Sequence, residues 1–331
     1  MTTDSRTDYR IDWNALTLPQ LFDELARADA VIAVERALAE DLGAAGISGD
    51  VTSAVTIAPT ARGRARVVSR SSGVVAGLRV AEIIAQRAGL TLTVHVDDGS
   101  RVERGTRIAS LEGPLVSLLA HERTMLNFLT LLSGNATLAA QFVDAVRGTK
   151  AQITDTRKTV PGLRTLQKYT TRCAGATLHR IGLFDAVLLK DNHLAAFSSG
   201  TLVERVRLAA LRARSGNHVA FVQCEVDSLE QLDALLTLER GVLDMILLDN
   251  MNVELLTEAV KRRDARAAHV LLEASGGVRL DTVRRIAECG VDRISVGAIT
   301  HSAPALDLGL DLDPEHGHEA NSHNDSQRAS S

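Results

Sequence analysis

Aromatic residues are scarce in this 331-residue chain, which has one tryptophan, two tyrosines and six phenylalanines. Proteins that hold nucleic acid usually stack bases on aromatic rings and present a basic face. Here aromatic side chains make up only 3% of the sequence, the formal net charge is -4 and the pI is about 6.2. We therefore predict that the protein has no nucleic-acid partner.

Long apolar runs and closely spaced cysteines are also missing. No apolar stretch approaches the roughly 18 residues that a membrane-spanning helix needs, and the polar start MTTDSRTDYR lacks the apolar core of a signal peptide. Cys173, Cys224 and Cys289 have no CxxC spacing, which is typical of buried or idle thiols in a reducing compartment. We expect a cytoplasmic protein without a membrane partner.

Positive charge is concentrated between Thr154 and Leu194, although the chain as a whole is acidic. This segment has only three acids, and its seven basic residues are Arg157, Lys158, Arg164, Lys168, Arg172, Arg180 and Lys190. A local excess of cations in an acidic protein indicates an anion-binding site. The alternative is a solvated basic helix, although such a helix usually interleaves acids with its cations.

The first part of the chain mixes helical and strand patterns. Residues 1–20 have the composition of a frayed or loosely docked tail, and 21–42 have the apolar spacing of a helix. Strand patterns follow at 65–68 and 73–76, and alternation over 90–111 predicts a hairpin. These patterns predict an α+β domain. A largely apolar helix over 115–132 and a second helix over 135–146 then lead into the rest of the chain.

From about residue 151 the sequence repeats a short apolar strand, a polar residue at its end, and a helix. The strand patterns cover 153–154, 186–189, 219–224, 244–248, 270–274 and 294–296. Alternating strand and helix patterns predict a parallel sheet. Six polar strand ends favour a barrel, whose chemistry lies at the carboxyl ends of its strands; a doubly wound sheet would keep the same polarity and is the alternative.

Two kinds of polar group follow these strands. Glu225 and Asp249 end consecutive strands and suit a divalent ion or sugar hydroxyls, although helix caps or ion pairs would also explain them. Ser275-Gly276-Gly277 precedes a helix, and Gly297 follows the next strand, so their amides are suited to bind a phosphate. The residues thus predict a barrel enzyme that binds a metal-associated, phosphorylated substrate beside a carboxylated one.

The same blocks resemble those of the quinolinate phosphoribosyltransferases, also called nicotinate-nucleotide pyrophosphorylases (carboxylating). The blocks are HERTMLN, the segment from Thr154 to Leu194, EVDS, LLDNM, LEASGGV and ISVGAITHSAP, in family order from about Leu38 to Leu312. The resemblance implies an N-terminal α/β sandwich, an incomplete (β/α) barrel and a homodimer with shared active sites. It places the sandwich at 21–133 and the barrel at 134–313, between a tail of residues 1–20 and a disordered tail of 314–331.

The resemblance also implies the reaction and the residue roles. Quinolinate and phosphoribosyl pyrophosphate, with Mg²⁺, would give nicotinate mononucleotide, pyrophosphate and carbon dioxide in NAD synthesis. Lys158, Lys190, Glu225 and Asp249 would be catalytic, with Glu225 and Asp249 holding ribose hydroxyls and the magnesium complex. The other implied substrate-binding residues are Arg123 (reaching the partner's quinolinate), Thr156, Arg157, His179, Arg180, Ser275, Gly276, Gly277, Val296, Gly297, Ala298 and His301.

Two other functions fit parts of the pattern. One is another transferase of the same fold, such as a nicotinate phosphoribosyltransferase or the molybdenum-operon relative, acting on nicotinate or another small carboxylated ring. A substrate with one carboxylate needs fewer cations than Arg123, Arg157, Arg180 and Lys190 supply. A non-catalytic phosphate-binding barrel that senses a metabolite would bind its ligand without releasing pyrophosphate, and it has no use for the acid pair Glu225 and Asp249.

Overall fold

The computed structural model describes residues 11–43, 49–197, 199–216 and 219–313, and the predicted tail of 314–331 lies outside them. The chain forms two compact units that interleave along the sequence. We call Leu18–Leu138, Pro161–Ala174 and residues 303–313 the sandwich unit, and residues 11–17, Ala139–Val160 and Gly175–Ser302 the barrel unit. The contiguous domain boundaries at 20, 133 and 313 stay a prediction, because these two units group segments by packing and not by sequence order.

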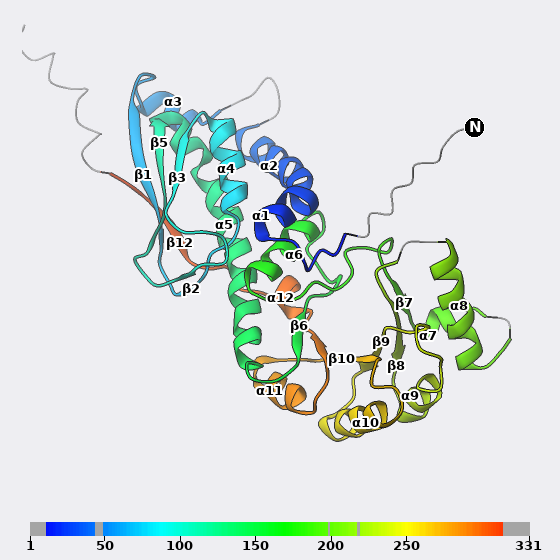
Figure 1. The fold of residues 1–331 in the computed structure, drawn as a ribbon. Coiled ribbons are helices and arrows are strands. Elements are labelled where there is room, and N and C mark those ends of the chain that lie inside the picture. The colour runs from blue at the N-terminus through cyan, green and yellow to red at the C-terminus, as the bar shows by residue number, and fades with distance from the viewer. Residues whose placement is uncertain (1–10, 44–48, 198, 217–218, 314–331) are drawn as a thin grey trace, which may run out of the picture. The chain divides into compact units, whose positions relative to one another are not determined.

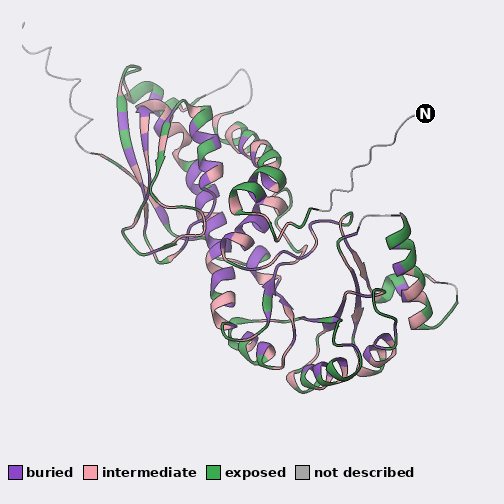
Figure 2. Cartoon of the chain, in the orientation of Figure 1, coloured by how far each residue is buried: buried purple, intermediate pink, exposed green. Residues whose placement is uncertain are grey.

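The sandwich unit combines an antiparallel sheet with helices. Its helices are α1 (Leu18–Leu21), a π-helical turn (Phe22–Ala26), α2 (Arg27–Leu42), α3 (Val51–Thr56), α4 (Leu78–Ala88) and most of α5 (Leu115–Ala145). Its main sheet has the order β12-β1-β5-β3, made of Leu308–Leu312, Arg62–Ser69, Arg107–Pro114 and Thr91–Val94, and β2 (Gly73–Val74) pairs with β4 (Arg101–Val102). Alternate residues of β1 and β5 are buried, as expected for strands with one covered face (Figure 2).

Helix α5 runs without interruption, whereas the sequence suggested two helices separated near residue 133. Gly134 lies inside the helix because another part of the sandwich unit passes very close to it. A Cβ at this position would lie 2.1 Å from the carbonyl oxygen of Pro304. Gly134 therefore allows a close approach between two backbone segments.

Helix α6 (Arg164–Cys173) lies between two barrel segments in the sequence but packs in the sandwich unit. Long-range side-chain hydrogen bonds help to hold it there. Tyr169 donates its hydroxyl to Asp98 Oδ2 at 2.8 Å, Gln167 Nε2 donates to Asn135 at 3.1 Å, and Thr165 donates to Asp29 at 2.8 Å. These long-range contacts place the helix in the sandwich unit, although its neighbours in the sequence belong to the barrel unit.

Asp98 provides a test of how this helix is held. Its Oδ1 also accepts the backbone N–H of Leu78 at the start of α4, and burial raises the pKa of its carboxyl above 3.8. A carboxyl whose pKa is raised in the folded protein adds to the free energy of unfolding below about pH 3.8. This contribution is lost as the pH rises through the pKa of the folded protein. Asp98→Asn removes the charge, keeps one oxygen to accept the Leu78 N–H, and offers its side-chain NH2 as a donor to the Tyr169 oxygen. It is expected to match or exceed the wild-type denaturation midpoint at pH 7.5, with a smaller advantage at pH 4.5.

The matched variant Asp98→Ala leaves the Leu78 amide and the Tyr169 hydroxyl without their acceptor. It is expected to lose about 2–3 kcal/mol of unfolding free energy, because buried donors without partners are costly. Urea denaturation of both variants at the two pH values measures this. An advantage of Asp98→Asn that grew at pH 4.5 would contradict the argument.

The barrel unit is built on one parallel sheet of six strands in the order β6-β11-β10-β9-β8-β7 (Figure 1). The strands are Gln152–Thr154, Arg293–Ser295, Leu271–Ser275, Met245–Asp249, Val222–Val226 and Val187–Leu189. Within this sheet, the strand that comes last in the chain, β11, pairs in parallel with the strand that comes first, β6. Thr154 of β6 makes a further bridge to Thr177. The strands therefore follow chain order around a barrel that is incomplete between β6 and β7. This confirms the predicted fold class and excludes the doubly wound sheet.

The helices that follow these strands in the barrel unit are α7 (Asp191–Ala195), α8 (Leu202–Gly216), α9 (Leu229–Leu235), α10 (Val253–Arg266), α11 (Leu280–Glu288) and α12 (Ala298–His301). Local caps set several of their starts. Asn252 accepts the Leu255 amide at 2.9 Å at the start of α10, and Ser228 accepts the Gln231 amide at 3.4 Å at the start of α9. These caps lie just after the ends of β9 and β8, so the loops that carry polar residues are short and fixed.

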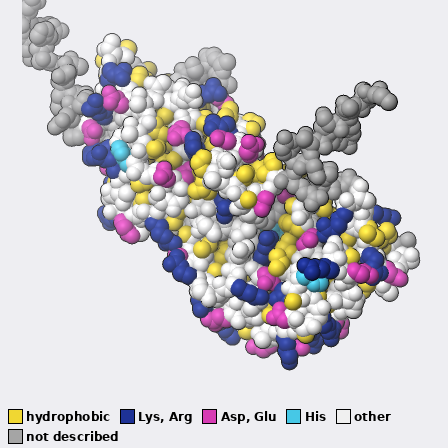
Figure 3. All heavy atoms as spheres, in the orientation of Figure 1, with side chains coloured by type: hydrophobic (Ala, Val, Ile, Leu, Met, Phe, Trp, Pro, Cys, Tyr) yellow, Lys and Arg dark blue, Asp and Glu magenta, His cyan; other side chains and the backbone are white. Residues whose placement is uncertain are grey.

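No helix in the described part of the chain is both long and apolar enough to cross a membrane. On the face shown in Figure 3, the Lys and Arg side chains alternate with Asp and Glu, and no continuous basic tract covers the described surface there. The absence of a nucleic-acid partner stays a prediction.

Candidate functional site

A cleft of about 590 Å³ lies in the barrel unit, where the parallel strands end. Its lining brings together many of the predicted site residues, namely Thr156, Arg157, Lys158, His179, Arg180, Lys190, Glu225, Asp249, Ser275, Gly276 and Gly277. They come from the loops after β6, β7 and β10, from the 178–182 loop and from the ends of β8 and β9. Parallel strands put their carboxyl ends at one edge, so residues far apart in sequence meet here.

Two guanidinium groups mark one end of the cleft. Burial, and then the nearby positive charge of Arg157, lower the pKa of Arg180. Arg180 Nη1 donates only a long hydrogen bond, 3.3 Å, to the carbonyl of Ala186. Arg157 Nε is buried and has no hydrogen-bond partner within the described residues. Two neighbouring, partly desolvated cations with unused donors form a site for an anion, most directly a carboxylate.

His179 lies beneath these cations and is only 7% exposed. Its Nδ1 accepts the backbone N–H of Arg180 at 2.8 Å, so the ring carries its proton on Nε2. That Nε2 lies 3.0 Å from Gln223 Oε1 and 3.4 Å from Glu273 Oε1. Both ring nitrogens therefore face protein groups, and His179 supports the loop that carries Arg180.

The acids at the strand ends lie next to the cationic end. Lys190 Nζ and Glu225 Oε2 form an ion pair at 2.5 Å, with the Glu225 side chain 17% exposed. Asp249 ends β9, and its Oδ2 accepts Asn250 Nδ2 at 2.8 Å. Glu225 on β8 and Asp249 on β9 belong to neighbouring strands, as the sequence suggested.

Glycines and Asn250 shape the end of the cleft beyond β10. Gly276 has φ +100°, and a Cβ there would lie 2.1 Å from Asn250 Oδ1. Asn250 itself has φ +53°, and its backbone N–H donates to the Ser275 carbonyl at 2.9 Å. The β9 and β10 loops thus interlock, which leaves the Ser275-Gly276-Gly277 backbone open to the cleft.

Other predicted residues do not line this cleft. Arg123 is exposed on α5 in the sandwich unit. The remaining predicted residues outside the lining are Val296, Gly297, Ala298 and His301. A Cβ on Gly297 would lie 3.0 Å from His301 Nε2 and 3.3 Å from Lys158 Cδ, and Thr300 Oγ1 donates to the Lys158 carbonyl at 2.7 Å. The segment after β11 therefore supports the Lys158 loop.

The cationic segment also divides between the two units. Arg157, Lys158, Arg180 and Lys190 line the cleft, whereas Arg164, Lys168 and Arg172 lie on α6 in the sandwich unit. Lys168 is fully buried there. Local charge in the sequence thus overstated the number of cations at the site.

Asn250, Glu273 and Ser295 line the cleft but were not among the predicted site residues. Glu273 is fully buried, accepts Ser295 Oγ at 2.7 Å, and has a second oxygen, Oε2, without a partner among the described residues. Burial by itself raises its pKa, but the interactions with His179, Ser295 and Arg293 lower the pKa below the ordinary value. A charged residue inside the apolar strand pattern 270–274 was the signal that could have identified it.

The carboxylates at the site do not form a complete metal cage. Within the described residues there is no group of three or more His, Cys, Asp or Glu side chains that could hold a metal ion. Glu225 and Asp249 nevertheless offer oxygen donors on adjacent strands. This arrangement fits a magnesium ion that takes its remaining ligands from substrate phosphates and water.

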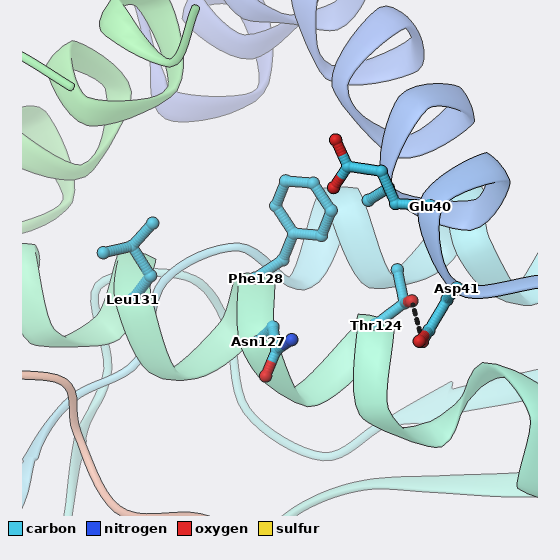
Figure 4. A pocket seen from close by; sticks show the side chains of 7 residues that line it. Glu40, Asp41, Thr124, Asn127, Phe128 and Leu131 are labelled. Atoms are coloured by element: carbon cyan, nitrogen blue, oxygen red, sulfur yellow. Dashed lines mark hydrogen bonds between the residues drawn. The ribbon is translucent and has the colours of Figure 1, made fainter. Parts of the chain in front are cut away.

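A second cavity, of about 250 Å³, lies in the sandwich unit between α2 and α5 (Figure 4). Its polar groups are Glu40, Asp41, Thr124 and Asn127, and Thr124 donates its hydroxyl to Asp41 at 3.0 Å. Its described lining contains two acids and no cation, which does not suit a phosphorylated or carboxylated ligand. The barrel cleft is therefore the candidate active site.

Comparison with known proteins agrees with this architecture. The family models for the C-terminal and N-terminal domains of quinolinate phosphoribosyl transferase match residues 135–311 and 50–133. The chain belongs to the quinolinate phosphoribosyltransferase family. It is 46% identical over 283 residues to the "Nicotinate-nucleotide pyrophosphorylase [carboxylating]" of Mycobacterium leprae, a match that covers 84% of this chain and 95% of the relative.

Other members of the family are similar over most of the chain. The chloroplastic nicotinate-nucleotide pyrophosphorylase [carboxylating] of Arabidopsis thaliana is 36% identical, with 87% of this chain and 84% of the relative covered. The solved nicotinate-nucleotide pyrophosphorylase of Francisella tularensis has a TM-score of 0.78 and 33% identity, and covers 88% of this chain and 99% of its own. The family resemblance of the sequence blocks is thus confirmed.

Proposed function

We propose that this protein transfers the phosphoribosyl group of phosphoribosyl pyrophosphate to quinolinate with loss of carbon dioxide. The products would be nicotinate mononucleotide, pyrophosphate and carbon dioxide, in the de novo synthesis of NAD. The observation that carries the proposal is the pair Arg157 and Arg180, two neighbouring cations with unused donors beside the acid pair Glu225 and Asp249. Family membership supports the same activity.

The cationic end is proposed to bind the acceptor. Quinolinate has two adjacent carboxylates on a pyridine ring, and the guanidinium forks of Arg157 and Arg180 match carboxylates in two-point contacts. Lys190 adds a third positive charge and lies in the same cleft. Two-point contacts fix the orientation of the pyridine ring, so its nitrogen can be directed at the anomeric carbon of the ribose.

The opposite end is proposed to bind the phosphoribosyl donor. The amides of the Ser275-Gly276-Gly277 turn suit the 5′-phosphate, and Glu225 and Asp249 suit the ribose hydroxyls. We include Mg²⁺ as the cofactor, because both acids are oxygen donors and neither belongs to a complete protein cage. When bound, the ion would neutralise charge on the departing pyrophosphate.

The charges of the cleft suit both chemical stages. As pyrophosphate leaves, positive charge develops on the ribose ring, and the carboxylates of Glu225 and Asp249 stabilise it by their negative charge. After the ring nitrogen is alkylated it is cationic, so it stabilises the electron pair left on the ring carbon when the adjacent carboxylate departs as carbon dioxide. A proton from water then takes up this electron pair and forms the C–H bond of the product. These two stages need no covalent nucleophile. The burial of Cys173 in the sandwich unit and of Cys224 agrees with this.

Carbon dioxide release tests this activity directly. Purified protein with phosphoribosyl pyrophosphate, Mg²⁺ and quinolinate labelled in the 2-carboxylate is expected to release labelled carbon dioxide and pyrophosphate in equal amounts. Nicotinate in place of quinolinate is expected to give little pyrophosphate. A preference for nicotinate would favour the related transferase, and binding without pyrophosphate release would favour a non-catalytic metabolite sensor.

We also propose that the protein works in the cytoplasm as a homodimer in which Arg123 completes the partner's site. Apolar side chains that a partner could cover support the dimer: Ile32, Val51 and Val55 are 66%, 78% and 83% exposed in the sandwich unit. If the sites are shared, Arg123→Ala and Lys190→Ala should each be inactive, and the mixed proteins should regain part of the activity. Failure to complement, or a monomer in sedimentation velocity, would contradict the shared site.

A further inference from the structure

The loop that carries His179 and Arg180 is held almost entirely by side chains. Each of the five consecutive backbone N–H groups from Leu178 to Gly182 donates to a side-chain atom, at 2.7–2.8 Å. The acceptors are Asn14, Asp155, His179, Asp185 and again Asp185, in that order. Among the residues that the structure describes, no strand pairs with this segment, which we call the 178–182 loop, so its position depends on these side chains.

Asn14 is the acceptor that comes from farthest away in the sequence. Its side-chain amide makes two hydrogen bonds to one residue, accepting from Leu178 N at 2.7 Å and donating to Leu178 O at 3.2 Å. Asn14 is itself held in a turn, since its backbone N–H donates to Asp12 Oδ1 at 3.0 Å. The amide thus pairs with the start of the 178–182 loop in the way that a neighbouring strand would.

The amino-terminal segment and the candidate active site lie on different sides of this loop. Ile11–Asn14 line a cavity of about 370 Å³ together with Leu178, His179 and Arg180, near the residues that begin β8, β9, β10 and β11. His179 and Arg180 also line the cleft at the carboxyl ends of the strands. A shift of the amino-terminal segment would therefore be transmitted to Arg180 through the loop backbone.

We propose that the amino-terminal segment Asp12–Asn14 is a positioning element for the acceptor end of the active site, with Asn14 as its positioning residue. The inference rests on the proposed function, because it assigns the 178–182 loop to quinolinate. Asn14 does not touch the substrate; it fixes Leu178, and thereby holds Arg180 beside Arg157. Two-point recognition of a carboxylate is sensitive to small displacements, so a loosened loop weakens quinolinate binding.

The first test is the kinetics of Asn14→Ala in the full-length protein. The variant is expected to raise the quinolinate KM about tenfold, which corresponds to the loss of one or two neutral hydrogen bonds. The KM for phosphoribosyl pyrophosphate is expected to change by less than about twofold, because the donor end is built from other loops. Asn14→Asp, which keeps the acceptor but loses the donor, should give an intermediate quinolinate KM.

Thr149→Val is the matched control. Thr149 also makes two hydrogen bonds to the backbone of the barrel unit, to Val146 O at 2.7 Å and from Ala151 N at 3.3 Å, and it does not line the cleft. Loss of the Thr149 hydroxyl is expected to lower the stability of the folded protein. It should not change the KM for quinolinate more than the KM for phosphoribosyl pyrophosphate. An equal rise of both KM values in Asn14→Ala would show a general structural role and overturn the inference.

Trp13 is the only tryptophan of the chain and reports directly on the segment. Quenching of its fluorescence by acrylamide is expected to increase in Asn14→Ala and to stay unchanged in Thr149→Val. Increased quenching with a wild-type quinolinate KM would overturn the inference, and so would a raised KM without increased quenching. If wild-type protein did not turn over quinolinate at all, the proposed function would fail instead, so the two failures are distinguishable.

Discussion

Arg157→Ala is expected to raise the KM for quinolinate by about 30- to 1,000-fold, while the KM for phosphoribosyl pyrophosphate changes by less than about threefold. Loss of one charge-assisted two-point contact costs roughly 2–4 kcal/mol, which gives this range. The effect is large because Arg157 Nε is buried without a partner among the described residues and Arg180 lies close enough for its pKa to be affected. The two KM values are measured from initial rates, with one substrate varied while the other is saturating.

Two further variants make this result specific. Arg157→Lys keeps the charge but loses the planar fork, so its quinolinate KM should lie between those of the wild type and Arg157→Ala. Arg284→Ala removes an exposed arginine of α11 that pairs with Glu288 at 2.7 Å, and it should leave both KM values unchanged. Equal effects of Arg157→Ala on the two substrates would refute the assignment of Arg157 to quinolinate.

Glu225→Gln is expected to lower kcat about 100- to 1,000-fold, in the range seen when one preorganised electrostatic group is removed. The carboxylate is mostly buried and forms a 2.5 Å ion pair with Lys190, so the variant also leaves that cation without its acid. If Glu225 holds the magnesium complex of the donor, half-maximal activity should require more Mg²⁺. Rates as a function of Mg²⁺ at saturating quinolinate measure both effects.

Asp227→Asn is the control for this substitution. Asp227 follows Glu225 by two residues, is exposed and does not line the cleft, so the same change of carboxylate to amide should leave kcat and the Mg²⁺ requirement unchanged. A Glu225→Gln enzyme with wild-type kcat and wild-type Mg²⁺ dependence would remove Glu225 from the donor site.

The sequence alone determined the parallel barrel strands and most of the cleft. Apolar runs that end in a polar residue are a local signal, and parallel strands bring such ends together, so Lys190, Glu225, Asp249 and Ser275 could be assigned to one edge before any contact was known. The quinolinate phosphoribosyltransferase blocks then supplied the family. Arg157 and Arg180 were found by their local excess of charge.

The tertiary structure alone decided where the interrupted segments pack. Helix α6 has the charge of an active-site helix, but Tyr169 and Asp98 hold it in the sandwich unit, and β12 pairs with β1 across more than 200 residues of chain. Asn14 gave no signal in the sequence, because its two hydrogen bonds to Leu178 span 164 residues. Local patterns record periodicity and charge, whereas such long-range pairings depend on the whole fold, and in this protein they decide which cations reach the cleft and what holds their loop in place.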